Sequence, residues 1–277
     1  MTAAVPRRLL AEFTGTGLLV AIVAGSGIAA TRLTTDGALR LLVNSLVTAL
    51  GLAVLILAFI QAGGAHFNPV VTAADWVLGR RGPRRHGLGQ AAAVIACQVA
   101  GAIAGAALAD AMFGAPVLSA SQHHRGGAPM LLSEVVATAG LLLVIVTLAR
   151  TGRLQHVAWA VGAWIGAAYW FTASTSFANP AVTIGRAFTN TYAGIAPASV
   201  PAFIAAQLAG GVIGTVLAVT LYPARHGQVP VAVRPIRDDD DIDRRTRQLL
   251  DELLGSQPWQ AGGTHDPAPG MGQAGSP

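Results

Sequence analysis

The chain has 277 residues, of which 53% are hydrophobic and only 11% are charged. A water-soluble domain of this size rarely carries so few charges, so the composition indicates a membrane protein. The formal net charge is +5, and all 18 basic residues are arginine. Because these arginines follow the ends of apolar segments, they indicate membrane topology and not a nucleic-acid partner.

Six apolar segments approach the roughly 20 residues that a helix needs to cross the hydrocarbon core of a bilayer. They are residues 9–30, 41–62, 91–113, 130–149, 156–173 and 200–222. The sequence therefore predicts an all-α membrane protein. Its predicted membrane domain covers residues 9–223, with a first half at 9–113 and a second half at 130–223. Residues 1–8 are a predicted N-terminal segment, and residues 224–277 a predicted, mostly disordered tail.

Arginines gather at alternate ends of the apolar segments, as the positive-inside rule expects. The residues concerned are Arg7, Arg8, Arg80, Arg81, Arg84, Arg85, Arg150, Arg153 and Arg225. This pattern predicts that both termini are cytoplasmic. The absence of lysine is typical of a GC-rich bacterial gene, so we expect a multi-pass protein of a bacterial cell membrane. Residues 243–254 predict a transient helix in a solvated tail, or else an amphipathic helix on a membrane surface.

The two halves of the chain repeat each other. Residues 68–72 read Asn-Pro-Val-Val-Thr after the second apolar segment, and residues 179–183 read Asn-Pro-Ala-Val-Thr after the fifth. Glu12 and Glu134 open the first and fourth segments in similar surroundings. Because each half has three segments, an odd number, the second half enters the membrane from the opposite side. The repeat is therefore predicted to be inverted.

Each Asn-Pro pair begins a short apolar stretch, about half the length needed to span the bilayer. Asn is a good N-cap and Pro fits the first helical position, so residues 70–78 and 181–188 are predicted as re-entrant half-helices. Their positive N-termini would meet near mid-membrane, which disfavours cations, while the amides of Asn68 and Asn179 donate hydrogen bonds to neutral solutes. The alternative, two ordinary capped helices, does not explain a matched pair.

The segment Gly64-Ala-His-Phe-Asn-Pro-Val-Val-Thr72, together with Asn179-Pro-Ala181, resembles the paired Asn-Pro-Ala signatures of the aquaporin and glycerol-facilitator family, the major intrinsic proteins. The resemblance covers residue 8 to about residue 223. It implies six tilted transmembrane helices, two half-helices and usually a homotetramer with one pore per subunit. The implied pore centre consists of Asn68, Pro69, Val70, Asn179, Pro180 and Ala181. Glu12 and Glu134 are implied to support the loops before the half-helices, and His66 to line the cytoplasmic pore mouth.

The sequence departs from the family at the selectivity filter. Most members carry Arg directly after the second Asn-Pro-Ala, and here the residue is Val182. Counting in register with the family places the other filter positions at Thr48, Ala167 and Ser176, so that all four are small and uncharged. Arg186 lies one helical turn beyond Val182. It either restores a positive charge at the pore mouth or reaches a headgroup or a loop carbonyl.

These features predict a passive channel for water and small uncharged solutes. The pattern is similar to that of bacterial channels associated with arsenic resistance, which implies undissociated arsenite as a solute. Glycerol, urea, ammonia and hydrogen peroxide are further candidates. An ion- or proton-coupled transporter is the main alternative, because inverted repeats and broken helices also serve alternating access. A junction protein with an incidental pore is a weaker one.

The sequence predicts neither an enzyme nor a cofactor. No nucleophile, base and orienting group come together on any segment. Cys97 is the single cysteine, which excludes an intramolecular disulfide and a multi-cysteine metal site. His123 and His124 form an incomplete metal site and are expected to be surface residues. The predicted partners are therefore the lipid bilayer, small neutral solutes and further copies of the chain.

Overall fold

The computed structural model describes residues 4–79 and 87–223. The chain divides into two units, residues 1–235 and 236–277, and every described residue belongs to the first. The predicted tail, its helix at 243–254 and the arginines at positions 80, 81, 84, 85 and 225 lie outside the described residues.

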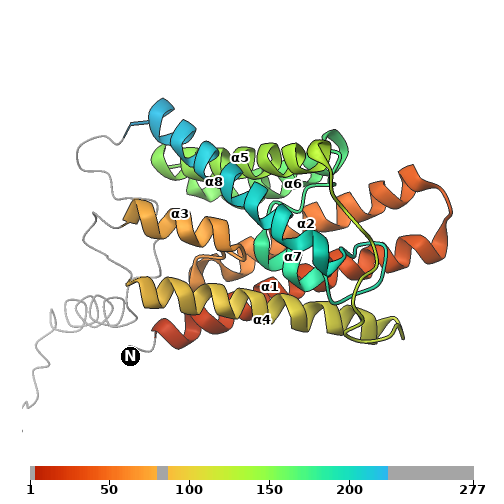
Figure 1. Ribbon diagram of the computed structural model, residues 1–277. Coiled ribbons are helices and arrows are strands. Elements are labelled where there is room, and N and C mark those ends of the chain that lie inside the picture. The colour runs from red at the N-terminus through yellow and green to blue at the C-terminus, as the bar shows by residue number, and fades with distance from the viewer. Residues whose placement is uncertain (1–3, 80–86, 224–277) are drawn as a thin grey trace, which may run out of the picture. The chain divides into compact units, whose positions relative to one another are not determined.

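The described residues form helices and connecting loops (Figure 1). The helices are α1 (Ala4–Leu33), α2 (Gly37–Gly63), α3 (Pro69–Gly79), α4 (Leu88–Met112), α5 (Ala128–Arg150), α6 (Val157–Phe171), α7 (Pro180–Arg186) and α8 (Val200–Leu221). Two short 3-10 turns, η1 (Leu154–His156) and η2 (Pro197–Ser199), precede α6 and α8. The two predicted half-helices are α3 and α7.

Five of these helices are long and apolar enough to cross a membrane: α1, α2, α4, α5 and α8. They correspond to five of the six apolar segments of the sequence. The remaining segment, 156–173, forms α6, which has only 15 residues. At 1.5 Å per residue, α6 alone covers roughly 22 Å of the roughly 30 Å hydrocarbon core. The turn η1 directly precedes it and extends the helical segment.

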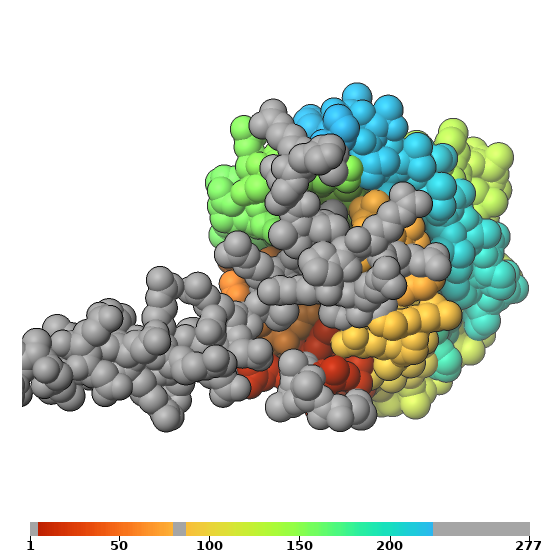
Figure 2. All heavy atoms as spheres, turned by 90° about the vertical axis from the view of Figure 1, so that its left-hand side faces the viewer, coloured from red at the N-terminus to blue at the C-terminus, as the bar shows by residue number. Residues whose placement is uncertain are grey.

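The helices are arranged as an inverted repeat. α1 packs mainly against α4 and α2, and in the second half α5 packs mainly against α8 and α6. α2 and α6 pack against each other across the two halves. Each half-helix also contacts the other half, because α7 packs on α4 and α3 packs on both α4 and α8. The view down one end shows α3, in orange, between α4 and α8 (Figure 2).

Glycines let the paired long helices approach closely. A Cβ atom on Gly105 of α4 would overlap the carbonyl oxygen of Gly17 on α1, and a Cβ on Gly214 of α8 would overlap that of Ala139 on α5. In membranes, helices associate through such close backbone contacts because lipid offers no hydrophobic driving force between them. The contact between α1 and α4 therefore depends on glycine at position 105.

We expect Gly105→Ala to lower the melting temperature of the purified protein in detergent, because overpacking a tight contact costs roughly 1–3 kcal/mol. Gly89 lies on the same helix, and a Cβ atom added there would have no neighbouring atom within 4 Å among the described residues. Gly89→Ala is therefore the matched control, with a melting temperature unchanged or slightly raised by the better helix propensity of alanine. Equal losses in the two variants would contradict the packing argument.

Candidate functional site

Both half-helices begin with an asparagine whose side chain caps its own helix. The Oδ1 atom of Asn68 accepts a hydrogen bond from the backbone N–H of Val70 at 2.9 Å. The Oδ1 atom of Asn179 accepts from the N–H groups of Ala181 at 3.0 Å and Val182 at 3.2 Å. These bonds satisfy N–H groups that a helix start otherwise leaves without partners. The sequence predicted both caps.

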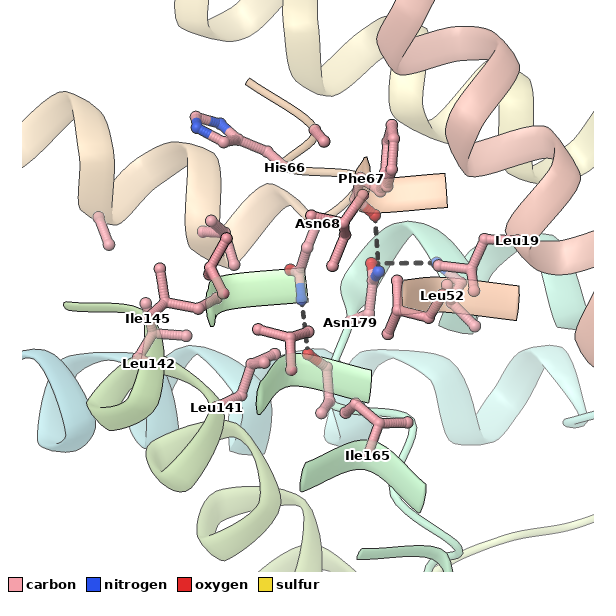
Figure 3. A pocket seen from close by; sticks show the side chains of 18 of the residues that line it. Leu19, Leu52, His66, Phe67, Asn68, Leu141, Leu142, Ile145, Ile165 and Asn179 are labelled. Atoms are coloured by element: carbon pink, nitrogen blue, oxygen red, sulfur yellow. Dashed lines mark hydrogen bonds between the residues drawn. The ribbon is translucent and has the colours of Figure 1, made fainter. Parts of the chain in front are cut away.

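The same two asparagines tie the halves of the chain together. The Nδ2 atom of Asn68 donates to the carbonyl oxygen of Ala178 at 2.8 Å, and the Nδ2 atom of Asn179 donates to that of Phe67 at 2.7 Å. Figure 3 shows both bonds and the two side chains at the point where the loops meet. A side-chain amide has two N–H donors, so each asparagine has a second N–H group beside the adjoining cavity.

A buried glutamate holds the first loop. The carboxylate of Glu12 accepts from the backbone N–H of His66 at 2.9 Å and of Phe67 at 2.8 Å. The Nε2 atom of Gln98 donates to the same carboxylate at 2.8 Å and to the Oγ1 atom of Thr72 at 2.9 Å. Burial of a carboxylate is tolerated where such donors replace water. The loop support expected of Glu12 is therefore present in the structure.

Glu134 holds the second loop in the same way. Its carboxylate accepts from the backbone N–H groups of Phe177 and Ala178, both at 2.9 Å. The Nε2 atom of Gln207 donates to it at 2.7 Å, and the Oγ atom of Ser174 donates at 2.6 Å. With four donors on one carboxylate, this loop is fixed at several points at once.

The loops before α3 and α7 also have the same strained backbone conformation at equivalent positions. Ala65 and Phe67 have φ values of 49° and 50°, and the equivalent residues Ser176 and Ala178 have 50° and 49°. Residues other than glycine adopt this left-handed conformation at a cost, so it persists where surrounding bonds fix it. Here it turns the carbonyls of Phe67 and Ala178 toward the asparagine of the opposite half.

A cavity of about 90 Å³ runs along these loops, which is room for several water molecules. Most of its wall is apolar, and Leu141, Leu142, Ile145 and Ile165 face the asparagines across it (Figure 3). The predicted site residues that line it are Thr48, His66, Asn68, Ser176, Asn179, Val182 and Arg186. We call the end lined by Leu78 of α3 the α3 end, and the end lined by Arg186 of α7 the α7 end.

The predicted filter position at Ala167 is wrong. Ala167 is exposed and does not line the cavity, whereas Tyr169 is buried and lines it. The hydroxyl of Tyr169 lies 3.3 Å from the Oγ1 atom of Thr48. Residues two apart point to nearly opposite sides of a helix, so a count that is off by two selects the wrong face. The α7 end therefore contains a large phenol in addition to small residues.

Four residues assigned to the pore centre do not line the cavity: Pro69, Val70, Pro180 and Ala181. Val70, which replaces the family's alanine, packs against α8 instead. A Cβ atom on Gly211 would overlap the Cγ1 atom of Val70, so the glycine provides the space that the larger side chain needs. The extra bulk of valine at this position therefore lies outside the cavity.

Arg186 combines the two alternatives that the sequence left open. It is only 2% exposed and lines the cavity, and its Nε atom donates to the loop carbonyl of Ala193. The guanidinium carbon lies 3.4 Å from the centre of the Phe177 ring, a cation–π contact. Arg125, from the loop before α5, lies 5.2 Å from the same ring and donates to the carbonyl of Gly194 at 2.8 Å. Burial lowers the pKa of Arg125 from its ordinary value.

Sequence reasoning missed Asp75 on α3. Its side chain lines the cavity together with His66, and the Oδ2 atom of Asp75 lies 3.9 Å from the Nε2 atom of His66. The Nδ1 atom of His66 lies 3.2 Å from the Oγ1 atom of Thr72. An acidic residue on an apolar half-helix was the available signal, because charges inside membrane segments mark functional sites.

Two half-helices that meet at paired asparagines, inside a bundle of apolar helices, define a membrane protein with an internal cavity that both asparagines line. A sequence model of the Major intrinsic protein family matches residues 1–156 of the chain. The chain is 49% identical over 211 residues to the aquaglyceroporin AqpS of Rhizobium meliloti (strain 1021), a match that spans 76% of this chain and 88% of that protein. The chain belongs to the Major intrinsic protein family and is a multi-pass membrane protein.

More distant relatives agree with this assignment. The aquaporin NIP1-3 of Oryza sativa is 33% identical over 202 residues, covering 68% of this chain and 66% of that protein. Among solved structures, the X-ray structure of the aquaglyceroporin from Plasmodium falciparum has the same fold, with a TM-score of 0.60 and 18% identity. That match covers 77% of this chain and 95% of the other.

Proposed function

We propose that the chain is a passive channel for water and small uncharged solutes. The observation that carries the proposal is the pair of asparagine amides at the meeting point of α3 and α7. Each amide keeps one N–H donor beside a cavity that is otherwise mostly apolar. A neutral solute regains there part of the hydrogen bonding that it loses on leaving water, whereas the two half-helix N-termini disfavour cations.

The proposed solutes are water and small polyols, amides or weak acids in their uncharged form, with glycerol, urea and undissociated arsenite as test compounds. Two features support solutes larger than water. Val182 stands where most family members carry a filter arginine, and the similar protein from Rhizobium meliloti is named an aquaglyceroporin. Tyr169 and Arg186 line the same end of the cavity as Val182. The proposed filter therefore combines the apolar side chain of Val182 with the phenol of Tyr169 and the guanidinium of Arg186.

The first test is the entry of water, glycerol, urea and arsenious acid into proteoliposomes, measured by stopped-flow light scattering. We expect the wild-type chain to conduct solutes as well as water. Val182→Arg should reduce glycerol and urea entry at least tenfold while water flow persists, because Val182 lines the cavity and a guanidinium there narrows it. Wild-type vesicles that conduct water and no solute would show that the solute assignment is wrong.

A coupled transporter is the alternative function, and kinetics separate it from a channel. A carrier saturates at moderate solute concentration and loses net uptake when the proton gradient collapses. A passive channel shows flux proportional to the solute gradient and no response to an uncoupler. Uptake that collapses with the gradient would therefore replace the channel proposal with the transporter.

We also propose the assembly and the orientation that the family implies: a homotetramer in a bacterial cell membrane, with both termini in the cytoplasm. The beginning of α1 and the end of α8 lie at the same end of the bundle (Figure 1). This arrangement supports placing both termini on one side of the membrane. Cross-linking in native membranes tests the tetramer. Protease accessibility of terminal tags in sealed vesicles tests the orientation.

A further inference from the structure

Opposite charges occupy equivalent positions on the two half-helices. Asp75 is the seventh residue after Asn68, and Arg186 is the seventh residue after Asn179. Both side chains are buried and both line the cavity. The inverted repeat therefore places a carboxylate toward the α3 end of the cavity and a guanidinium at the α7 end.

The side chain two residues before each asparagine is a planar ring that lies next to the charged group of the same half-helix. On the α3 side this is His66, whose Nε2 atom lies 3.9 Å from the Asp75 carboxylate. On the α7 side it is Phe177, whose ring centre lies 3.4 Å from the Arg186 guanidinium carbon. The two arrangements are counterparts in position and differ in charge, so the pore is electrically asymmetric.

Among residues 4–79 and 87–223, no carboxylate pairs with Arg186 and no arginine pairs with Asp75. Besides its contact with Phe177, Arg186 donates to one carbonyl through Nε, and its terminal nitrogens donate to no described protein atom. Asp75 has only the 3.9 Å contact with His66 within that part of the chain. A buried charge with so few polar contacts is costly, which indicates that both groups act on what enters the cavity.

The middle of the cavity and its α7 end are positive. The N-termini of α3 and α7 each contribute roughly half a positive charge at the centre. Arg186 adds a full charge, and the guanidinium carbon of Arg125 lies 5.2 Å from the centre of the same Phe177 ring. This arrangement repels cations and attracts anions. A channel for uncharged solutes therefore needs a separate barrier against anions.

We propose that Asp75 is this anion barrier, so that charge selection is divided between two ends of the pore: Arg186 and the half-helix N-termini exclude cations, and Asp75 excludes anions. The inference rests on the proposed channel function. Asp75 suits the role because it is the one carboxylate among the described residues that line the cavity. Glu12 and Glu134 are outside the lining, and loop donors occupy them.

The test measures nitrate entry into proteoliposomes that contain the full chain. The vesicles are placed in potassium nitrate with valinomycin, which carries the potassium across the bilayer, so that the rate of vesicle swelling reports nitrate entry. We expect Asp75→Asn to raise nitrate entry at least tenfold over wild type, because the amide keeps the size of the side chain and removes its charge. Asp75→Glu keeps the charge and should exclude nitrate as the wild type does. Asp75→Ser removes the charge with a smaller side chain, in case the amide obstructs the cavity.

A double variant tests the asymmetry. Adding Arg186→Gln to Asp75→Asn should lower nitrate entry at least threefold relative to Asp75→Asn alone, because it removes positive charge that attracts the anion. Urea entry into the same vesicles shows whether each pore is folded and open. If wild-type vesicles exclude urea and other neutral solutes, the channel function itself fails. If they admit urea and both Asp75→Asn and Asp75→Ser exclude nitrate, or if Asp75→Glu admits it, the anion barrier is wrong.

Discussion

Glu134→Leu is expected to lower the melting temperature by more than about 10 °C and to abolish conduction. The substitution removes the acceptor of four hydrogen bonds, from Ser174, Phe177, Ala178 and Gln207. Each buried donor left without a partner costs about 1–3 kcal/mol. The sum is comparable with the entire stability of a typical protein, about 5–15 kcal/mol. For a domain of this size, each kcal/mol lowers the melting temperature by about 2–4 °C.

Thermal unfolding in detergent, followed by circular dichroism, measures this effect. Glu134→Gln keeps one acceptor oxygen but turns an NH₂ group toward the donors, so its loss should be intermediate. Val136→Ala is the matched control, because Val136 lies on the same helix with an exposed side chain. A Glu134→Leu protein as stable as the control would show that the loop does not depend on this carboxylate.

Asn179→Leu is expected to reduce glycerol and urea permeability at least about fivefold. The variant removes the N–H donor beside the cavity, the bond to the carbonyl of Phe67 and the cap of α7. A hydrogen bond that a solute fails to regain costs about 1–3 kcal/mol, and about 1.4 kcal/mol corresponds to a factor of ten. Loss of the cap adds a stability cost of about 0.5–2 kcal/mol, visible as a lower melting temperature.

Stopped-flow measurements at equal protein density in the vesicles separate conduction from expression. Val70→Ala is the control within the equivalent motif, since Val70 packs on Gly211 and lies outside the cavity lining. It should conduct glycerol and urea. Wild-type permeability in Asn179→Leu would mean that solutes do not depend on the central amides.

The features that the sequence predicted correctly depend on local chemistry. Asn68 and Asn179 carry helix-start signals that act within three residues, so both half-helices were placed to within about two residues of their observed ends. The inverted repeat followed from the recurrence of these signals in the two halves, the long helices followed from the apolar segments, and the bundle was implied by the family. The support by Glu12 and Glu134 was implied by the family, and the hydrogen bonds now account for it physically.

The features that the sequence did not predict depend on how α6 is rotated about its axis and on equivalent positions in α3 and α7. Ala167 and Tyr169 are separated from Asn179 by a loop in which Thr175 and Ser176 have left-handed backbone conformations. Counting residues back from Asn179 across this loop therefore does not show which face of α6 points into the cavity. The significance of Asp75 depends on its position, because it lies as far from Asn68 as Arg186 lies from Asn179. An alignment of α3 with α7 would have exposed the opposite charges.

The reciprocal bonds of the two asparagines have a consequence for biosynthesis. Asn68 needs the carbonyl of Ala178, and Glu134 needs Gln207 on α8. While the ribosome is still making the second half, the first loop has no partner for its amide and the second loop lacks one of its donors. The hydrogen bonds that join the two loops to each other and to α8 are therefore complete only after α8, the last membrane helix, is inserted.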